Sequence, residues 1–241
     1  MKKIDTEEMR SLVLAIADRM IASKPLLTEV DSKIGDGDHG IGMETGFLAV
    51  RETLNGKSFS TINELFRQTG MAMLNSMGGA SGVIFSSIFL GGVKGMPDMT
   101  EVTCADFAGM MGHSLEAIQK RGNAKLGDKT MVDAFAPACA AMDGYTGENF
   151  AELFACAAEA AYQGMENTKM YVAKFGRAKS LMDRGLGFKT QGQLRCGLFG
   201  RQPQTGRVRR RLWREKACNW FRQCCFWYER NVKKVSFRER L

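Results

Sequence analysis

The feature that most limits the fold is a helical periodicity that recurs along most of the chain. Leu12, Ile16 and Met20 share one face of a helix expected over 6–23, and Pro25 ends that run. Further segments rich in helix formers follow at 41–55, 61–77, 82–93, 103–121, 129–142, 148–164 and 167–175. Their connections are short and rich in Gly, Asn or Asp. No segment shows the alternation of apolar and polar residues that is typical of a strand. We therefore expect an all-α fold, a single bundle of antiparallel helices.

The composition changes abruptly near residue 189. From Lys189 onward there are 15 Lys+Arg and 3 Asp+Glu, which leaves 19 and 23 of the chain's 34 and 26 before it. The formal charge of +8 therefore divides into +12 in the tail and −4 in the body. The tail also holds all three Trp and none of the 16 Met. We expect a helical domain at 1–188 and a distinct basic tail at 189–241.

The remaining composition argues against secretion and membrane insertion. Cys104, Cys139 and Cys156 are scattered, with neither metal-ligand spacing nor a paired framework, as is typical of a reducing cytosol. The N-terminus mixes acids into the region where a signal peptide would be basic and then apolar, and no apolar run approaches membrane-spanning length. We expect a cytoplasmic protein with no membrane partner, and the mildly acidic body gives no reason to expect a nucleic-acid partner.

A glycine-spaced acidic loop carries the strongest chemical signal. Asp31, Asp36 and Asp38 lie within eight residues, and crowded carboxylates repel one another unless a cation lies between them. Oxygen ligands of this kind suit Mg²⁺. A calcium-binding EF-hand loop starting at Asp36 is excluded, because Gly40 and Phe47 occupy two of its ligand positions. A solvated Gly/Asp turn is the structural alternative.

Two glycine-containing segments could contact phosphates. Met77-Gly-Gly-Ala-Ser-Gly82 precedes an apolar helical run, so its backbone N–H groups could cradle an anion, although such turns are often only structural. The second segment is Arg121-Gly-Asn-Ala-Lys-Leu-Gly-Asp-Lys-Thr-Met-Val-Asp133. It nearly imitates a Walker A loop, but Asp128 separates Gly127 from Lys-Thr and no hydrophobic strand precedes it. We reject the P-loop and expect Asp128 to cap the following helix.

The two histidines differ in their surroundings. His113 lies within a helical run and is expected to be structural. His39 adjoins the acidic loop, where it could contact a phosphate or accept a phosphoryl group. With no Ser/His/Asp or Cys/His arrangement, a hydrolytic triad has little support.

Taken in order, these motifs and Gly176-Arg-Ala178 closely resemble the nucleotide-binding subunit L family of dihydroxyacetone kinases, from about Glu8 to Phe188. The resemblance implies an eight-helix barrel with the nucleotide at one end. It implies that two Mg²⁺ ions are held by Asp31, Asp36 and Asp38. It also implies contacts to ADP or ATP from His39, Gly40, Ile41, Gly42, Ala80, Ser81, Gly122, Met131 and Arg177.

The resemblance also implies partners. In multiprotein bacterial versions of this family, a phosphotransferase-system protein rephosphorylates bound ADP, and the phosphoryl group passes to dihydroxyacetone held by a separate subunit K. A homodimer or hetero-oligomer is expected. Phosphoryl transfer depends mainly on positioning and charge neutralisation, so dividing these roles between subunits is physically reasonable. A related kinase for another small ketose stays open as an alternative.

Two departures from the family pattern stand out. Gly42 occupies a position where relatives often carry Asn or Thr. After Phe188 the family's closing Gly-x-x-Asp-x-Gly-Ala-x-Ser motif and last helix are missing, and one inserted base, with suitable codons, would restore Phe-Gln-Asp-Ala-Gly-Ala-Thr-Ser. The tail is therefore interpreted as out of frame, which predicts an exposed apolar face. The competing interpretation is an inactive kinase body whose basic, Trp-containing tail binds nucleic acid.

Overall fold

Helices make up most of the part of the chain that the structure, a computed structural model, describes: residues 1–32, 37–175, 218 and 221. Within these residues the α-helices are α1 (Thr6–Ala22), α2 (Lys24–Ser32), α3 (His39–Leu54), α4 (Ile62–Ser76), α5 (Gly79–Gly92), α6 (Cys104–Gly122), α7 (Val132–Asp143) and α8 (Phe150–Asn167). A short 3₁₀ turn, η1 (Thr168–Met170), follows α8. The expected all-α class is confirmed.

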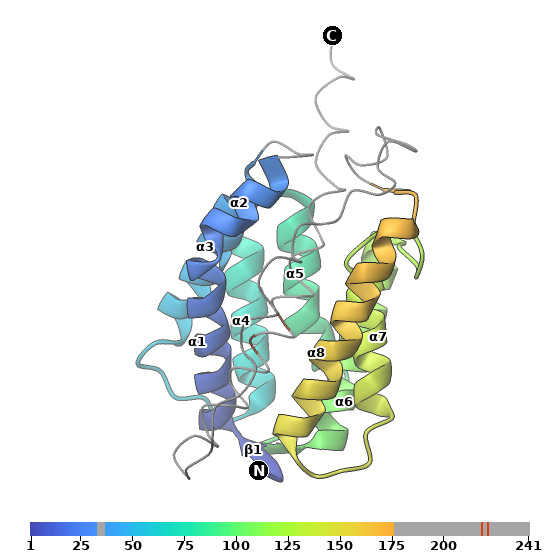
Figure 1. The fold of residues 1–241 in the computed structure, drawn as a ribbon. Helices are drawn as coiled ribbons and strands as arrows, with labels where there is room; N and C mark the ends of the chain where they lie inside the picture. The colour runs from blue at the N-terminus through green and yellow to red at the C-terminus, as the bar shows by residue number, and fades with distance from the viewer. Residues whose placement is uncertain (33–36, 176–217, 219–220, 222–241) are drawn as a thin grey trace, which may run out of the picture.

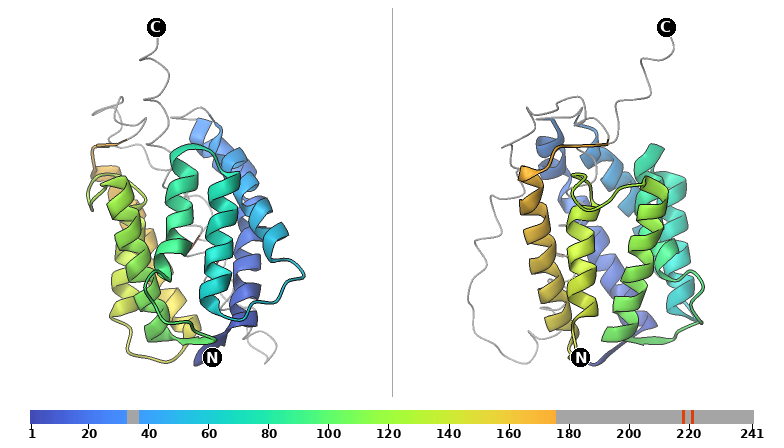
Figure 2. Two further views of the ribbon diagram at one scale, coloured as in Figure 1. Left: turned by 180° about the vertical axis from the view of Figure 1, so that it is seen from behind. Right: turned by 90° about the vertical axis from the view of Figure 1, so that its right-hand side faces the viewer.

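The long helices pack side by side around a common interior. Helix α1 packs on α3, and from α3 to α8 each helix packs on the one that follows it in the chain (Figure 1). The short α2 packs on α3. Because successive long helices run in opposite directions, their connections fall at two ends of the molecule (Figure 2). The upper end in Figure 1 collects the 32–39, 76–79 and 122–132 connections and the segment after α8. Most of the motifs singled out in the sequence therefore lie at that end.

A short antiparallel ribbon closes the opposite end. Strand β1 (Lys3–Asp5) pairs with β2 (Glu101–Thr103), and Ile4 and Val102 lie opposite each other and are fully buried. The sequence analysis expected no strand. Three residues are too few to produce a recognisable alternation, so the pattern could not have shown this ribbon.

Capping interactions fix where two of the helices begin. At α1, the Asp5 carboxylate accepts the Glu8 N–H while the Glu8 side chain accepts the Asp5 N–H, and Thr103 and Asp106 form the same reciprocal box at α6. Each box satisfies N–H groups that a helix start otherwise leaves unpaired. The β-strands lead directly into these two caps, so the ribbon and the helix starts form one unit.

Aromatic side chains dominate the interior. The Phe107 ring lies 6.1 Å from that of Phe150 and 5.3 Å from that of Phe154, edge to face in both cases. Phe221, from the far end of the chain, is 2% exposed and lies 5.9 Å from the ring of Phe47 and 5.8 Å from that of Phe89. The tail therefore contributes at least one side chain to the barrel interior.

The structure adds one helix that was not expected and shifts the bounds of several that were. Pro25 does end α1, but it lies in the first turn of the unexpected α2, where proline is tolerated because its missing N–H has no helical partner. Helix α7 begins at Val132 rather than near 129. The helix expected over 167–175 is reduced to η1, with the residues beyond it held by contacts to the α6–α7 loop.

Candidate functional site

The acidic loop joins the end of α2 to the start of α3. Asp31 is buried in the last turn of α2, and its carboxylate accepts the His39 N–H at 3.3 Å. Asp38 is the N-terminal capping residue of α3, where its main-chain oxygen accepts the N–H groups of Ile41 and Gly42 at 3.1 and 3.0 Å. Both carboxylates therefore flank the positive end of the α3 dipole. Asp36 lies outside the described residues.

The donor atoms here suit a hard cation. Asp31 and Asp38 both carry carboxylate oxygens, and Gly37 directly before Asp38 adopts a left-handed φ of 74°, a conformation that glycine accepts without strain. Within the described ranges no three His, Cys, Asp or Glu side chains gather into a metal-binding group. Because Asp36 is outside those ranges, the expected three-carboxylate site stays a prediction.

The segment from His39 to Gly42 forms the first turn of α3, and its members face different surroundings. His39 and Gly40 are buried, whereas Ile41 is 54% exposed. A side chain at Gly40 would overlap the Thr28 hydroxyl and the Lys24 carbonyl, so Gly40 allows α3 to approach α2 closely. Gly42 borders open space. Gly40 therefore has a clear packing role, while Gly42 has room for a larger residue.

The second motif forms the start of α5. Gly78 is the N-terminal capping residue, and Gly79 adopts a left-handed φ of 69°, with open space around both. Ala80 is exposed and Ser81 is buried. Within the described residues no side chain makes a capping hydrogen bond to this helix start, and a Cβ built on Gly78 or Gly79 would meet nothing within 4 Å. This is the backbone arrangement that an anion needs for close approach.

The third motif forms the loop between α6 and α7, and Asp133 organises it. Its buried carboxylate accepts the Gly127 N–H at 2.5 Å and the Thr130 N–H at 2.6 Å. Burial raises the pKa of the Asp133 carboxyl, while these N–H donors act in the opposite direction. Lys129, which precedes Thr130, is buried and has a left-handed φ of 59°. Residues other than glycine rarely adopt this strained backbone conformation.

Asp128 does not cap α7, which corrects the expectation from sequence. Its carboxylate accepts the Lys125 N–H at 2.7 Å and pairs with the Lys174 ammonium at 2.7 Å. Burial acts to raise the pKa of Asp128, but the Lys174 ammonium and the Lys125 N–H outweigh it and hold that pKa below its usual value. Asp128 therefore joins the loop to the segment after α8 instead of starting a helix.

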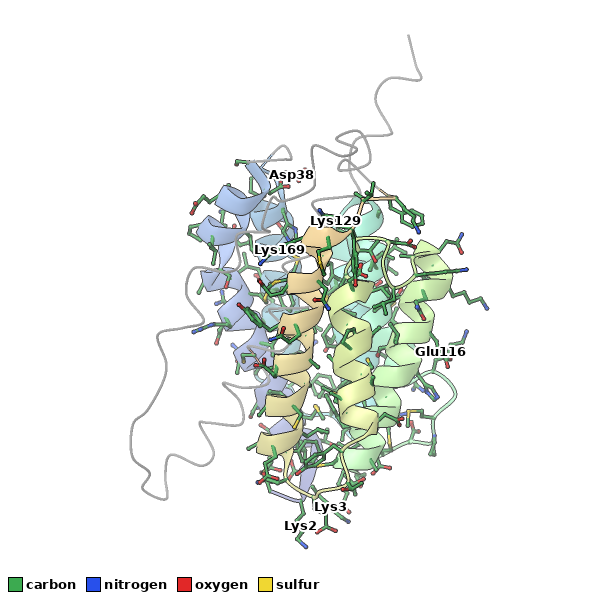
Figure 3. All side chains as sticks on the ribbon, turned by 45° about the vertical axis from the view of Figure 1, so that its right-hand side comes forward. Lys2, Lys3, Asp38, Glu116, Lys129 and Lys169 are labelled. Carbon is green, nitrogen blue, oxygen red and sulfur yellow. The ribbon has the colours of Figure 1, made fainter. Side chains whose placement is uncertain are left out.

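A cavity of about 410 Å³ lies between these motifs. Its lining is mainly apolar and comes from α5, α6, the loop after α6 and the segment after η1: Ala80, Val83, Ile84, Ile118, Arg121, Gly122, Ala124, Thr130, Met131, Val132 and Phe175. Its size falls within the range of roughly 300–1,000 Å³ typical of small-molecule sites. Figure 3 shows Asp38 and Lys129 at the same end of the molecule, opposite Lys2 and Lys3.

A second and larger cavity, of about 600 Å³, lies on the outer wall. It follows the seam between α5 and α6 and is bordered by charged side chains that include Lys94, Glu116 and Lys120. Arg121 borders both cavities. Apart from Arg121, this groove contains no residue from the three motifs, so the smaller apolar cavity is the better candidate site.

The cavity brings together part of the expected site. Three residues that were expected from two distant stretches to contact one ligand all line it: Ala80, Gly122 and Met131. His39–Gly42 and Ser81 lie at the same end but not in its wall, and Arg177 lies outside the described residues. Sequence reasoning missed Phe175, which directly precedes the Gly176-Arg177-Ala178 motif. Val83 and Ile84 were visible only as part of an apolar run.

Comparison with known proteins identifies the family. The DAK2 domain model matches residues 33–191, well over half of the chain. The chain belongs to the DAK2 domain family. Its matched region includes the α3 start, the α5 start and the α6–α7 loop, whereas Asp31 lies just before the first matched residue.

Several named proteins are similar to this chain in sequence. The chain is 38% identical over 171 residues to the PEP-dependent dihydroxyacetone kinase 2 ADP-binding subunit DhaL of Listeria innocua, covering 69% of this chain and 78% of the relative. It is 32% identical over 168 residues to the corresponding Escherichia coli subunit, covering 69% and 80%. An L-erythrulose kinase of Pectobacterium atrosepticum is 32% identical over 194 residues, covering 77% of this chain but 32% of that protein.

Solved structures share the fold. The dihydroxyacetone kinase of C. freundii superposes with a TM-score of 0.58 at 19% identity, covering 93% of this chain and 36% of that chain. A second structure of that kinase, in complex with AMP-PNP and Mg²⁺, gives a TM-score of 0.57 at 20% identity, covering 90% and 33%. The chain thus spans about a third of that solved kinase. Among the described helices, none is long and apolar enough to cross a bilayer.

Proposed function

We propose that this chain is the nucleotide-binding phosphotransfer subunit of a dihydroxyacetone kinase. The observation that carries the proposal is the 410 Å³ cavity, because Ala80 reaches it from one sequence motif and Gly122 and Met131 reach it from another. An apolar cavity suits a nucleotide base, and the open α5 start at Gly78 and Gly79 suits its phosphates. The relatives named as ADP-binding subunits support the same assignment.

The carboxylates of Asp31, Asp36 and Asp38 would hold two Mg²⁺ ions. Bound Mg²⁺ neutralises phosphate charge and orients the transferring phosphoryl group. The chemistry of the two described carboxylates fits this role: Asp38 caps the start of α3, and Asp31, at the end of α2, accepts the N–H of the first α3 residue, His39. The other expected contacts, from His39, Gly40, Ile41, Gly42, Ser81 and Arg177, complete the proposed ADP or ATP site.

In this proposal the protein groups bind and orient the nucleotide and form no covalent bond to it. The cavity wall excludes water from the base, and the first N–H groups of α5 neutralise phosphate oxygens without a change in geometry. The dihydroxyacetone is supplied by a partner subunit K, and the phosphoryl donor is ATP or a phosphotransferase-system protein. We place this reaction in the cytoplasm and expect a homodimer or hetero-oligomer.

Reconstitution tests the proposed reaction. The purified chain is mixed with a dihydroxyacetone-binding subunit K, and phosphoryl transfer is measured with ATP or with phosphoenolpyruvate and the phosphotransferase proteins as donor. The proposal predicts dihydroxyacetone phosphate formation that requires this chain and Mg²⁺. No product with either donor, alongside product from a relative's subunit under the same conditions, would contradict it.

A kinase subunit for another small ketose is the second candidate. The observation that favours it is the 32% identity to an L-erythrulose kinase. Both candidates predict the same nucleotide site, so only the carbohydrate distinguishes them. Faster transfer to erythrulose than to dihydroxyacetone, in the presence of the cognate subunit K, would support this alternative.

A further inference from the structure

Phe175 contributes an aromatic side chain to the wall of the 410 Å³ cavity, and it was not among the expected site residues. The other lining residues come from α5, α6 and the residues between α6 and the start of α7, whereas Phe175 follows η1. It is the aromatic residue among the described side chains that line this cavity. Its side chain is partly buried against the core.

A double attachment holds this segment in place. The Lys174 ammonium pairs with the Asp128 carboxylate at 2.7 Å, and the Lys174 N–H donates to the Asp128 main-chain oxygen at 3.3 Å. Asp128 is in turn bound to its own loop, because its carboxylate accepts the Lys125 N–H at 2.7 Å. The residue next to Phe175 is therefore fixed to the loop that supplies Thr130 and Met131 to the same cavity.

This attachment explains why the expected helix over 167–175 does not form. Thr168 closes the end of α8, where its hydroxyl donates to the Met165 carbonyl at 2.6 Å. The chain then crosses the upper end of the molecule in extended form instead of continuing along α8 (Figure 2). Because the chain is extended after η1, Phe175 reaches the cavity.

We propose that Phe175 is a binding residue that stacks on the nucleotide base, and that the Asp128–Lys174 pair holds it in position. The inference rests on the proposed nucleotide-binding function and adds to it the residue that contacts the base. Arg121 and Thr130 are the lining side chains with polar groups, so dispersion and stacking contribute most of the affinity for a base. An aromatic ring in the wall of an apolar cavity favours a planar ligand.

Pyrophosphate separates this role from a purely structural one. It carries the phosphates of ADP without the base, so a residue that contacts only the base affects ADP and leaves pyrophosphate binding unchanged. Calorimetry with Mg²⁺ on the full chain would compare Phe175→Ala, Phe175→Tyr, Lys174→Met and Lys174→Arg. The tyrosine and arginine variants preserve the ring and the charge, respectively.

The expected result is a selective loss. Phe175→Ala should weaken ADP binding by about tenfold, the scale of one lost base–aromatic stack, and leave pyrophosphate affinity within about twofold. Phe175→Tyr should restore ADP affinity. Lys174→Met should weaken ADP binding in the same selective way, and Lys174→Arg should restore it.

Two outcomes would overturn the inference while leaving the proposed function intact. The first is wild-type ADP affinity in Phe175→Ala, and the second is equal loss of ADP and pyrophosphate, which would mean that the substitution disturbs the fold. If the unsubstituted chain binds pyrophosphate but not ADP, the base site is wrong. If it binds neither, the proposed nucleotide function itself fails.

Discussion

At the scale of single residues, two neighbouring glycines of one helix should respond in opposite ways to the same substitution. Gly40→Ala should destabilise the fold by about 1–3 kcal/mol, because its Cβ would overlap Thr28 and the Lys24 carbonyl. Gly42→Ala should stabilise it by up to about 1 kcal/mol, because alanine favours a helix and the surrounding space is open. Urea unfolding of both variants measures the difference, and equal effects would contradict the packing of α2 on α3.

The pH dependence of one ion pair is also a residue-scale prediction. Since the pKa of Asp128 is lowered from 3.8 in the folded state, its stabilising contribution is present above that value and is lost as the pH falls through the folded pKa. The Tm difference between the unsubstituted chain and Asp128→Asn should therefore be larger near pH 6 than near pH 3. A difference that grows on acidification would contradict the pairing with Lys174.

At the scale of elements, the α6–α7 loop should depend on one carboxylate. Asp133→Ala leaves the Gly127 and Thr130 N–H groups without their acceptor and should cost about 1–3 kcal/mol of unfolding free energy. Asp143→Ala, at the exposed end of the same helix, is the matched control and should change stability by less than about 0.5 kcal/mol. Similar effects from both would mean that Asp133 does not organise the loop.

The elements also show how far the sequence could predict this structure. Long amphipathic runs such as 6–23 were predictable, because apolar residues at helical spacing mark the face of the helix that is buried. The loop at 122–132 was not, because Asp128 was judged by its position before a helix, whereas its partner Lys174 lies 46 residues away in the sequence. Helix α2 was missed since Pro25 ends one helix and begins another in nearly the same place.

The site was partly predictable for a related reason. Ala80, Gly122 and Met131 belong to motifs, and each motif is local, so a resemblance could supply them together. Phe175 has no such signal, because its place in the cavity results from an extended segment and a long-range ion pair. Contacts between distant segments are what a single sequence leaves undetermined.

At the scale of the whole molecule, the tail is part of the stability question. Phe221 packs between Phe47 and Phe89, although the sequence analysis expected the tail to leave an apolar face exposed. Phe221→Ala should therefore lower the unfolding free energy by about 3–5 kcal/mol. A double-mutant cycle with Phe89→Ala should give a coupling of about 0.5–1.5 kcal/mol. Loss of less than about 0.5 kcal/mol would show that the interior does not need Phe221.

Chain length provides a second test at this scale. A chain ending at residue 188 lacks Phe221 and should be less stable than the full chain, whereas a frame-repaired chain should be at least as stable if the tail is out of frame. Equal stability of the truncated and full chains would separate 189–241 from the fold. Steeply salt-dependent retention of RNA, lost on truncation, would instead support the nucleic-acid-binding alternative.

The central claim is that Mg²⁺ and a nucleotide bind together at the end of the barrel that carries the acidic loop. The most direct measurement is ADP affinity by calorimetry with and without Mg²⁺, for the full chain, Asp38→Ala and the control Asp98→Ala at the opposite end. The account predicts Mg²⁺-dependent binding that Asp38→Ala abolishes and Asp98→Ala leaves unchanged. ADP binding that is the same in all three proteins, or absent from the unsubstituted chain, would contradict it.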